Sequence, residues 1–410
     1  MESLNRLRQA FAGSSPMAMQ PLRSTTGYEA QPSPATTVRD TTSAAAGRTA
    51  LKATQEATAE ELRRLLSQPV RQVPTHEATV LQDLQDVTWR VIPGSPAAAP
   101  FEQATRNQAP AEARALERLS DSQREAYGRL AQAVQEDPIA RQAVQVLLLT
   151  DALTTQQTMD RSLTLLEGLG HLATDAPLAE GLPRALLLEQ LVRELATPSA
   201  ISQKSKGTCT VTSLQMLMSE RMPAEVTRLV TGLASPEGTV KLQDGSSFTR
   251  EEGTLQEDGS RRSVPSRLLQ PAMMEAARPK DYDNATDRFE DGRSGLMDGQ
   301  LGALASAMTG LEAIVSTVPG EAAGTYPAKE WDRVVREDLL RGKPVFVGLE
   351  LDIPDKATGS VSRGGHMFLV TGADAQHVHL VNPWGQEERM EKDDLLGRVS
   401  AVIVMEEPVR

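Results

Sequence analysis

Only one cysteine, Cys209, occurs among the 410 residues of this chain. An internal disulfide is therefore impossible, and buried apolar side chains and hydrogen bonds have to hold any folded region together. Hydrophobic residues make up 39% of the chain and aromatic residues 3%, which is low for a chain that is packed throughout. We expect part of the chain to bury little surface and the rest to form two or three regions.

The N-terminal part, residues 1–109, is the region expected to bury little. Residues 1 to about 55 are rich in Ala, Ser, Thr, Gln and Pro and show no sustained hydrophobic period. Such a segment does not bury enough apolar surface to offset the entropy lost on ordering. We predict that 1–109 is largely disordered or linker, with a short helix over 57–66 and one docked element over 80–89.

A helical period begins near residue 110. Apolar residues recur at spacings near 3.6 over 111–133, which predicts one helix there. Asp137-Pro138 is typical of a helix start, and two further helices are predicted over 158–173 and 182–195. We expect 110–198 to form a small helical bundle.

From residue 199 onward, helical and strand patterns are mixed. Helices are predicted over 209–218, 223–233, 265–277, 299–308 and 328–340, and strands over 240–242, 247–249, 345–351, 366–371, 377–381 and 399–405. Helices first and an antiparallel sheet second predict the α+β class for a domain over 199–410.

The surroundings of Cys209 indicate a reactive thiol. Gly207-Thr208 lead into a helix-like run that starts at Cys209, so open backbone N–H groups would point toward the sulfur. A helix N-terminus and a nearby imidazolium both lower the pKa of a thiol. His366 is the candidate imidazole, and Gly365 before it would let the backbone approach closely and keep a cleft uncrowded.

Two carboxamides complete this set. Asn382 lies sixteen residues after His366 on the next predicted strand, where its oxygen would fix the imidazole ring. Trp384 would cover that hydrogen bond and keep water away from it. Gln203 lies six residues before Cys209 and is the natural side-chain donor to an oxyanion, paired with the Cys209 N–H. These groups predict a thiol hydrolase with a Cys-His-Asn triad and a thioester intermediate.

The order and spacing of these residues resemble the papain-like cysteine peptidases over roughly 200–405. The resemblance is carried by Gly-Thr-Cys, by Asn-Pro-Trp-Gly and by Gln203, Cys209, His366 and Asn382. In that family a Gln six residues before the Cys forms the oxyanion hole, and the Asn that orients the His opens an Asn-x-Trp-Gly motif. The resemblance implies a papain-like catalytic domain with a helical half and an antiparallel sheet half, a protein or peptide substrate, and no cofactor.

Two other interpretations stay open. Thr210 stands where papain has an aromatic residue, which leaves the subfamily undecided. A transglutaminase, deamidase or acyltransferase would keep the fold and modify a partner protein. Asn382 and Gln203 count against that class, because such relatives more often orient the histidine with an acid and lack the Gln-to-Cys spacing. In a non-enzymatic protein, the helices of 110–198 would dock a partner and the catalytic half would be inert.

The net charge and the hydropathy of the chain exclude some classes of partner. The formal net charge of −12 disfavours nucleic acid and anionic membranes as main partners. No stretch approaches the roughly 18 apolar residues of a membrane span. His377 and His379 lack an evident third ligand, so we expect no metal.

The start of the chain has no apolar core of a signal peptide, which predicts cytoplasmic synthesis. A Ser/Thr/Ala-rich start before a catalytic C-terminal domain resembles the layout of bacterial effector proteins, which are secreted by a signal-peptide-independent system. The alternative is a cytosolic enzyme whose N-terminal half is an inhibitory or docking segment.

Overall fold

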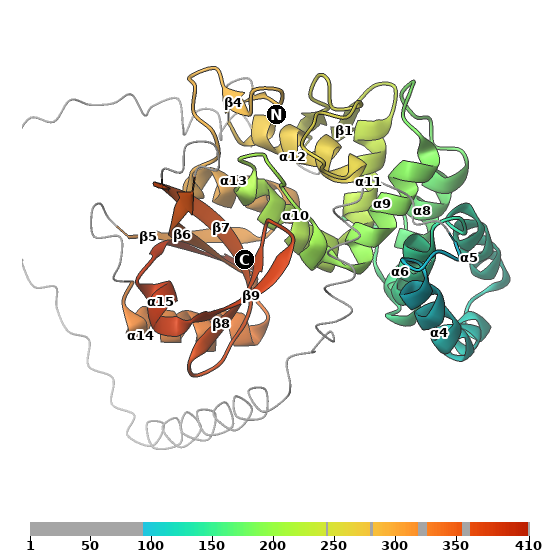
Figure 1. The fold of residues 1–410 in the computed structure, drawn as a ribbon, viewed down its shortest axis with the longest axis horizontal. Coiled ribbons are helices and arrows are strands. Elements are labelled where there is room, and N and C mark those ends of the chain that lie inside the picture. Colours follow the sequence, from blue (N-terminus) through green and yellow to red (C-terminus); the bar gives the residue numbers. More distant parts are fainter. Residues whose placement is uncertain (1–92, 243–244, 279–281, 319–325, 355–360, 409–410) are drawn as a thin grey trace, which may run out of the picture. The chain divides into compact units, whose positions relative to one another are not determined.

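The computed structural model describes residues 93–408, except 243–244, 279–281, 319–325 and 355–360. The elements predicted over 57–66 and 80–89, and the disorder predicted for most of 1–109, lie outside the described residues. The described part combines helices with antiparallel sheets, as the predicted α+β class requires (Figure 1).

The first described helices lie between residues 99 and 196, so helix begins before the predicted start at 110. They are α4 (Ala99–Glu117), α5 (Asp121–Ala133), α6 (Pro138–Leu149), α7 (Ala152–Thr155), α8 (Leu165–Thr174) and α9 (Arg184–Ala196). Asp137 caps α6, because its side chain accepts hydrogen bonds from the N–H groups of Ile139 and Ala140.

Two of the predicted helices in this region are wrong in extent, for the same reason. The period over 111–133 is interrupted by Ser120, whose side chain and that of Gln123 cap each other's backbone N–H groups and start α5. Thr164 and Glu167 form the same capping box at the start of α8. The residues from 158 to 163 are therefore a turn, because the helix cannot begin before its cap.

The later helices follow the predicted ones closely, except over 328–340, where α14 is continued by a π-helical and a 3₁₀ turn to residue 341. They are α10 (Cys209–Arg221), α11 (Pro223–Ala234), α12 (Val264–Ala277), α13 (Asp298–Thr309), α14 (Ala328–Arg333) and α15 (Lys392–Leu396). None of the described helices is both long enough and apolar enough to cross a bilayer.

A six-stranded antiparallel sheet has the strand order β5-β10-β6-β7-β8-β9. Its strands are β5 (Glu312–Thr317), β6 (Val345–Pro354), β7 (Val361–Ala373), β8 (His377–Asn382), β9 (Gln386–Glu391) and β10 (Val399–Glu406). Two short hairpins accompany it: β1 (Thr239–Lys241) with β2 (Ser247–Thr249), and β3 (Tyr282–Asp283) with β4 (Arg288–Phe289). The sequence patterns had indicated neither of the outer strands, β5 and β9.

The two faces of this sheet belong to two different cores. Met367 and Leu369 of β7 pack with the helices, whereas the alternating residues Phe368 and Val370 pack in a second core with Trp331. Alternation along a strand produces this division, because successive side chains point to opposite faces. His366 lies two residues before Phe368 on the same strand, so its side chain is expected on the same face of the sheet as Phe368.

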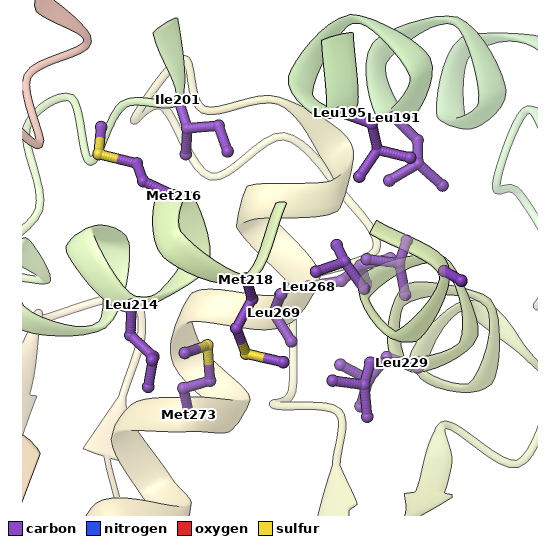
Figure 2. Packing of buried hydrophobic residues seen from close by; sticks show 14 of the residues in the cluster. Leu191, Leu195, Ile201, Leu214, Met216, Met218, Leu229, Leu268, Leu269 and Met273 are labelled. Atoms are coloured by element: carbon purple, nitrogen blue, oxygen red, sulfur yellow. The ribbon is translucent and has the colours of Figure 1, made fainter. Parts of the chain in front are cut away.

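The larger core joins α9 to α10, α11 and α12. Figure 2 shows Met218 of α10 near Leu268 and Leu269 of α12, with Leu229 from α11 and Leu191 from α9 in the same cluster. This packing surrounds α10 with apolar side chains. The helix that begins at Cys209 is therefore held on several sides.

A buried polar network crosses the same core. Glu194 of α9 accepts hydrogen bonds from Ser263, from Ser266 at 2.8 Å and from the Gln215 carboxamide at 2.9 Å. Gln215 in turn accepts from Gln270 Nε2 at 2.9 Å. Burial raises the pKa of Glu194 to about 7, although these three donors lower it.

This burial makes stability depend on pH. The folded-state pKa of Glu194 lies above the unfolded value of 4.5, so its contribution is fully present below pH 4.5 and is lost as pH rises through about 7. We predict that Glu194→Gln is more stable than the wild type by about 3 kcal/mol at pH 8, and by much less at pH 5. Urea unfolding at both pH values measures this. Glu220→Gln, at an exposed position of α10, is the control; equal gains at both pH values would contradict the prediction.

Candidate active site

Helix α10 begins at Cys209, as predicted, and two hydrogen bonds fix its first turns. Thr208, the residue before the helix, is fully buried and donates from its hydroxyl to Gln270 Oε1 at 3.0 Å. One turn later, Ser213 donates to the backbone oxygen of Met367 on β7 at 3.0 Å. The helix start is therefore tied both to α12 and to the central part of the sheet (Figure 1).

The thiol of Cys209 points to the strand that carries His366. It is partly buried and accepts hydrogen bonds from the backbone N–H groups of Met367, of Thr210 and of Cys209 itself. Met367 directly follows His366 on β7. The fold thus places the sulfur beside the backbone of the residue that follows His366.

His366 and Asn382 form the predicted hydrogen bond. The ring Nε2 lies 2.9 Å from Asn382 Oδ1, and the same oxygen accepts from the Trp384 backbone N–H at 3.0 Å. The Trp384 N–H can only donate, and the other end of the carboxamide donates to Glu388, so the atom that faces His366 is the carboxamide oxygen. In the neutral ring Nε2 therefore carries the hydrogen, which leaves the lone pair of Nδ1 to accept a proton.

Trp384 covers this hydrogen bond, again as predicted. Its ring lies 4.5 Å from the His366 ring between centroids, at an interplanar angle of 33°, and Phe368 contacts the imidazole edge-on at 4.9 Å. His366 is 4% exposed and Asn382 1%, while Trp384 itself is 42% exposed. The tryptophan therefore separates the pair from solvent.

The turn after Asn382 connects the sheet to the segment before Cys209. Gly385 donates its N–H to the backbone oxygen of Asn382 at 2.8 Å and has a φ of +84°. A Cβ at Gly385 would lie 3.0 Å from the Ala200 oxygen, so glycine suits both the backbone angle and the close contact. Pro383 within the turn accepts from the Gln203 N–H at 2.8 Å, which anchors Gln203 beside the turn.

The Gln203 carboxamide is held by the loop that leads to Cys209. Its Nε2 donates to the Lys206 oxygen at 2.6 Å, and Oε1 is buried with no hydrogen-bond partner among the described residues. One N–H of Nε2 is thus satisfied and the second is left to donate. Within the described ranges, no hydrogen bond joins Cys209 either to His366 or to Gln203.

Gly365 has a different setting from the one predicted. A Cβ at this position would meet no heavy atom of the described residues within 4 Å, so the expected close backbone approach is wrong. Gly365 is exposed and pairs with Glu350 of β6. A side chain at this position would meet only open space.

Burial shifts the pKa values of Cys209 and His366 toward their neutral forms. It raises the pKa of the Cys209 thiol despite the three N–H donors, and Asp287 raises that pKa further. Burial lowers the pKa of His366, while the hydrogen bond to Asn382 opposes this shift. The expectation of a lowered thiol pKa therefore does not hold for this state, because desolvation outweighs the helix N-terminus.

Two acidic residues at the site were not identified from the sequence. Asp287 lies between β3 and β4 and accepts from the Gly207 N–H at 2.6 Å. Glu388 of β9 accepts from Asn382 Nδ2 at 2.5 Å. No sequence signal pointed to either residue, because each depends on a contact between distant segments.

Comparison with known proteins adds no assignment: no family model matches this chain, and no curated protein is detectably similar. Over the described part of the chain, no group of three His, Cys, Asp or Glu side chains is placed to hold a metal ion.

Asp287 provides a test of the electrostatics at the thiol. Replacement by Asn removes a negative charge near the sulfur and keeps an oxygen that can accept from Gly207. We predict that Asp287→Asn lowers the pKa of Cys209 and speeds its alkylation by iodoacetamide at pH 7 about threefold. The rate is measured by mass spectrometry of the intact protein.

The matched control is Glu290→Gln, an exposed acid that follows β4 of the same hairpin. It removes the same charge without touching Gly207, so its alkylation rate should equal that of the wild type. Equal acceleration in both variants would mean that general charge, and not Asp287, acts on the thiol.

Proposed function

We propose that this protein is a cysteine peptidase that hydrolyses peptide or isopeptide bonds through a Cys-His-Asn triad. The observation that carries the proposal is the His366–Asn382 hydrogen bond of 2.9 Å at Nε2, next to a thiol held by the Met367 N–H. This bond leaves Nδ1 as the base for Cys209. A nucleophile, an oriented base and a helix N-terminus together are the parts that thiol acyl transfer needs.

The reaction would proceed in two steps. Cys209 Sγ attacks the carbonyl carbon while its proton passes to His366 Nδ1, and the carbonyl oxygen becomes an oxyanion. The Cys209 N–H and the second N–H of Gln203 Nε2 would donate to that oxyanion. The intermediate then expels the amine, which takes the proton from His366, and leaves a thioester. Water activated by His366 hydrolyses the thioester and regenerates the thiol.

The neutral resting pair is compatible with this chemistry. Burial disfavours the lone thiolate and the lone imidazolium, and the shifted pKa values of both groups reflect this. Proton transfer between them creates both charges together, so their mutual attraction offsets part of the desolvation cost. Attack and proton transfer would then occur in concert once a substrate is bound.

The family and the role in the cell belong to the same proposal. A papain-like fold is supported by α10 packing on β7 and by the Asn-Pro-Trp-Gly turn over the triad. Residues 199–410 would be the catalytic domain, and the helices of 110–198 a docking module or an inhibitory segment. Secretion as a bacterial effector, without a signal peptide, is the corresponding proposal for location.

We predict that the protein generates new peptide termini in a denatured proteome, and that Cys209→Ala abolishes them. Gln203→Ala should lower kcat about 10²-fold, because one oxyanion donor is lost. Mass spectrometry of new N-termini tests the first outcome, and kinetics on a cleaved peptide tests the second. Gln256→Ala, at an exposed loop position, is the matched control and should keep full activity.

The same mass spectra distinguish a peptidase from the other classes of enzyme and from a non-enzymatic protein. Mass changes on Gln or Lys side chains without new termini would identify a deamidase, transglutaminase or acyltransferase. No change of either kind would favour a non-enzymatic protein.

A further inference from the structure

The carboxamide of Asn382 is held from both ends. Its oxygen accepts from His366 and from the Trp384 N–H, while its nitrogen donates to Glu388 Oε1 at 2.5 Å. Asn382 is 1% exposed and Glu388 is half-buried. A short hydrogen bond from a buried amide to a carboxylate is among the stronger polar contacts in a protein.

Strand register places Glu388 behind the triad. Asn382 pairs with Gln386, and Leu380 pairs with Glu388, across β8 and β9. Leu380 and Asn382 lie on one face of β8, so Glu388 shares that face. The neighbouring Glu387 pairs with Val381 and lies on the opposite face. Two adjacent glutamates of equal charge thus lie on opposite faces of β9, and Glu388 is the one that contacts Asn382.

We propose that Glu388 is a positioning residue that extends the triad to Cys209–His366–Asn382–Glu388. The inference rests on the proposed function. The carboxylate keeps the Asn382 oxygen facing His366. Its negative charge also polarises the amide in the direction that stabilises a positive imidazole. The hydrogen bonds from ring to carboxamide to carboxylate all run the same way, so each strengthens the next.

The charge of Glu388 matters when the proton leaves the thiol. His366 then becomes an imidazolium, and Nε2–H donates to an oxygen made more negative by Glu388. Among the described residues, the site also holds the Cys209 thiol on α10, Asp287 between β3 and β4, and Lys206, whose Nζ donates to the Asn284 oxygen. Arg389, the next residue on β9, donates instead to His377 at 2.6 Å and leaves the Glu388 carboxylate to Asn382.

The test compares Glu388→Gln and Glu388→Leu with the control Glu387→Gln. The glutamine variant keeps an acceptor for Asn382 and loses the charge, whereas the leucine variant loses both. In Glu388→Gln we expect the neutral-pH part of the pH profile for iodoacetamide alkylation of Cys209 to fall about threefold, because proton transfer to His366 is less favoured. The rise at alkaline pH, where the thiol loses its proton to solvent, should stay. Glu388→Leu should also lower kcat about tenfold with an unchanged KM, and Glu388→Gln should recover most of that loss. The control should match the wild type.

Alkylation and peptide cleavage separate the two proposals. If alkylation shifts as expected but no peptide bond is cleaved, the role of Glu388 stands and the peptidase proposal fails. If both Glu388 variants match Glu387→Gln in pH profile and kcat, Glu388 only joins β8 to β9 and the inference is overturned. An alkylation profile that His366→Ala leaves unchanged would also overturn it, because Glu388 would then have no imidazole to act on.

Discussion

The packing of α10 against β7 is the contact on which the site depends. The Ser213 hydroxyl bonds to the Met367 oxygen, and the Cys209 thiol accepts from the Met367 N–H, so one residue of the strand holds the helix at two points. Apolar side chains of α9, α11 and α12 press on the same helix. Without that packing the thiol would not lie beside the strand that carries His366.

Electrostatics at this contact reflect a compromise. Burial disfavours the thiolate form of Cys209 and the imidazolium form of His366. The negative charge of Asp287 disfavours the thiolate further. The hydrogen bond from His366 to Asn382 favours the imidazolium, and Asn382 in turn donates a hydrogen bond to Glu388. A neutral pair at rest with support for the imidazolium is an arrangement that makes proton transfer conditional on attack.

The predicted helices that were wrong in extent had been placed by the hydrophobic period alone, and polar capping residues changed where the helices begin. Ser120 with Gln123, and Thr164 with Glu167, end or delay helices that apolar spacing had extended across them. Both capping boxes are visible in the sequence as Ser or Thr followed three residues later by Gln or Glu. The outer strand β9 carries Glu387, Glu388 and Arg389 and shows no alternating apolar pattern, because an edge strand packs little and is often charged.

The sequence by itself determined which residues are candidates for the site and the face on which most of them lie. Helix period, strand alternation and the Asn-Pro-Trp-Gly turn are local properties, so Cys209 at a helix start and Asn382 beside His366 could be derived from spacing. Tertiary structure alone decided the contacts of Asp287, Glu388 and the Gln203 carboxamide. It also decided the protonation of the thiol, since desolvation depends on what packs around a group and not on its neighbours in the chain.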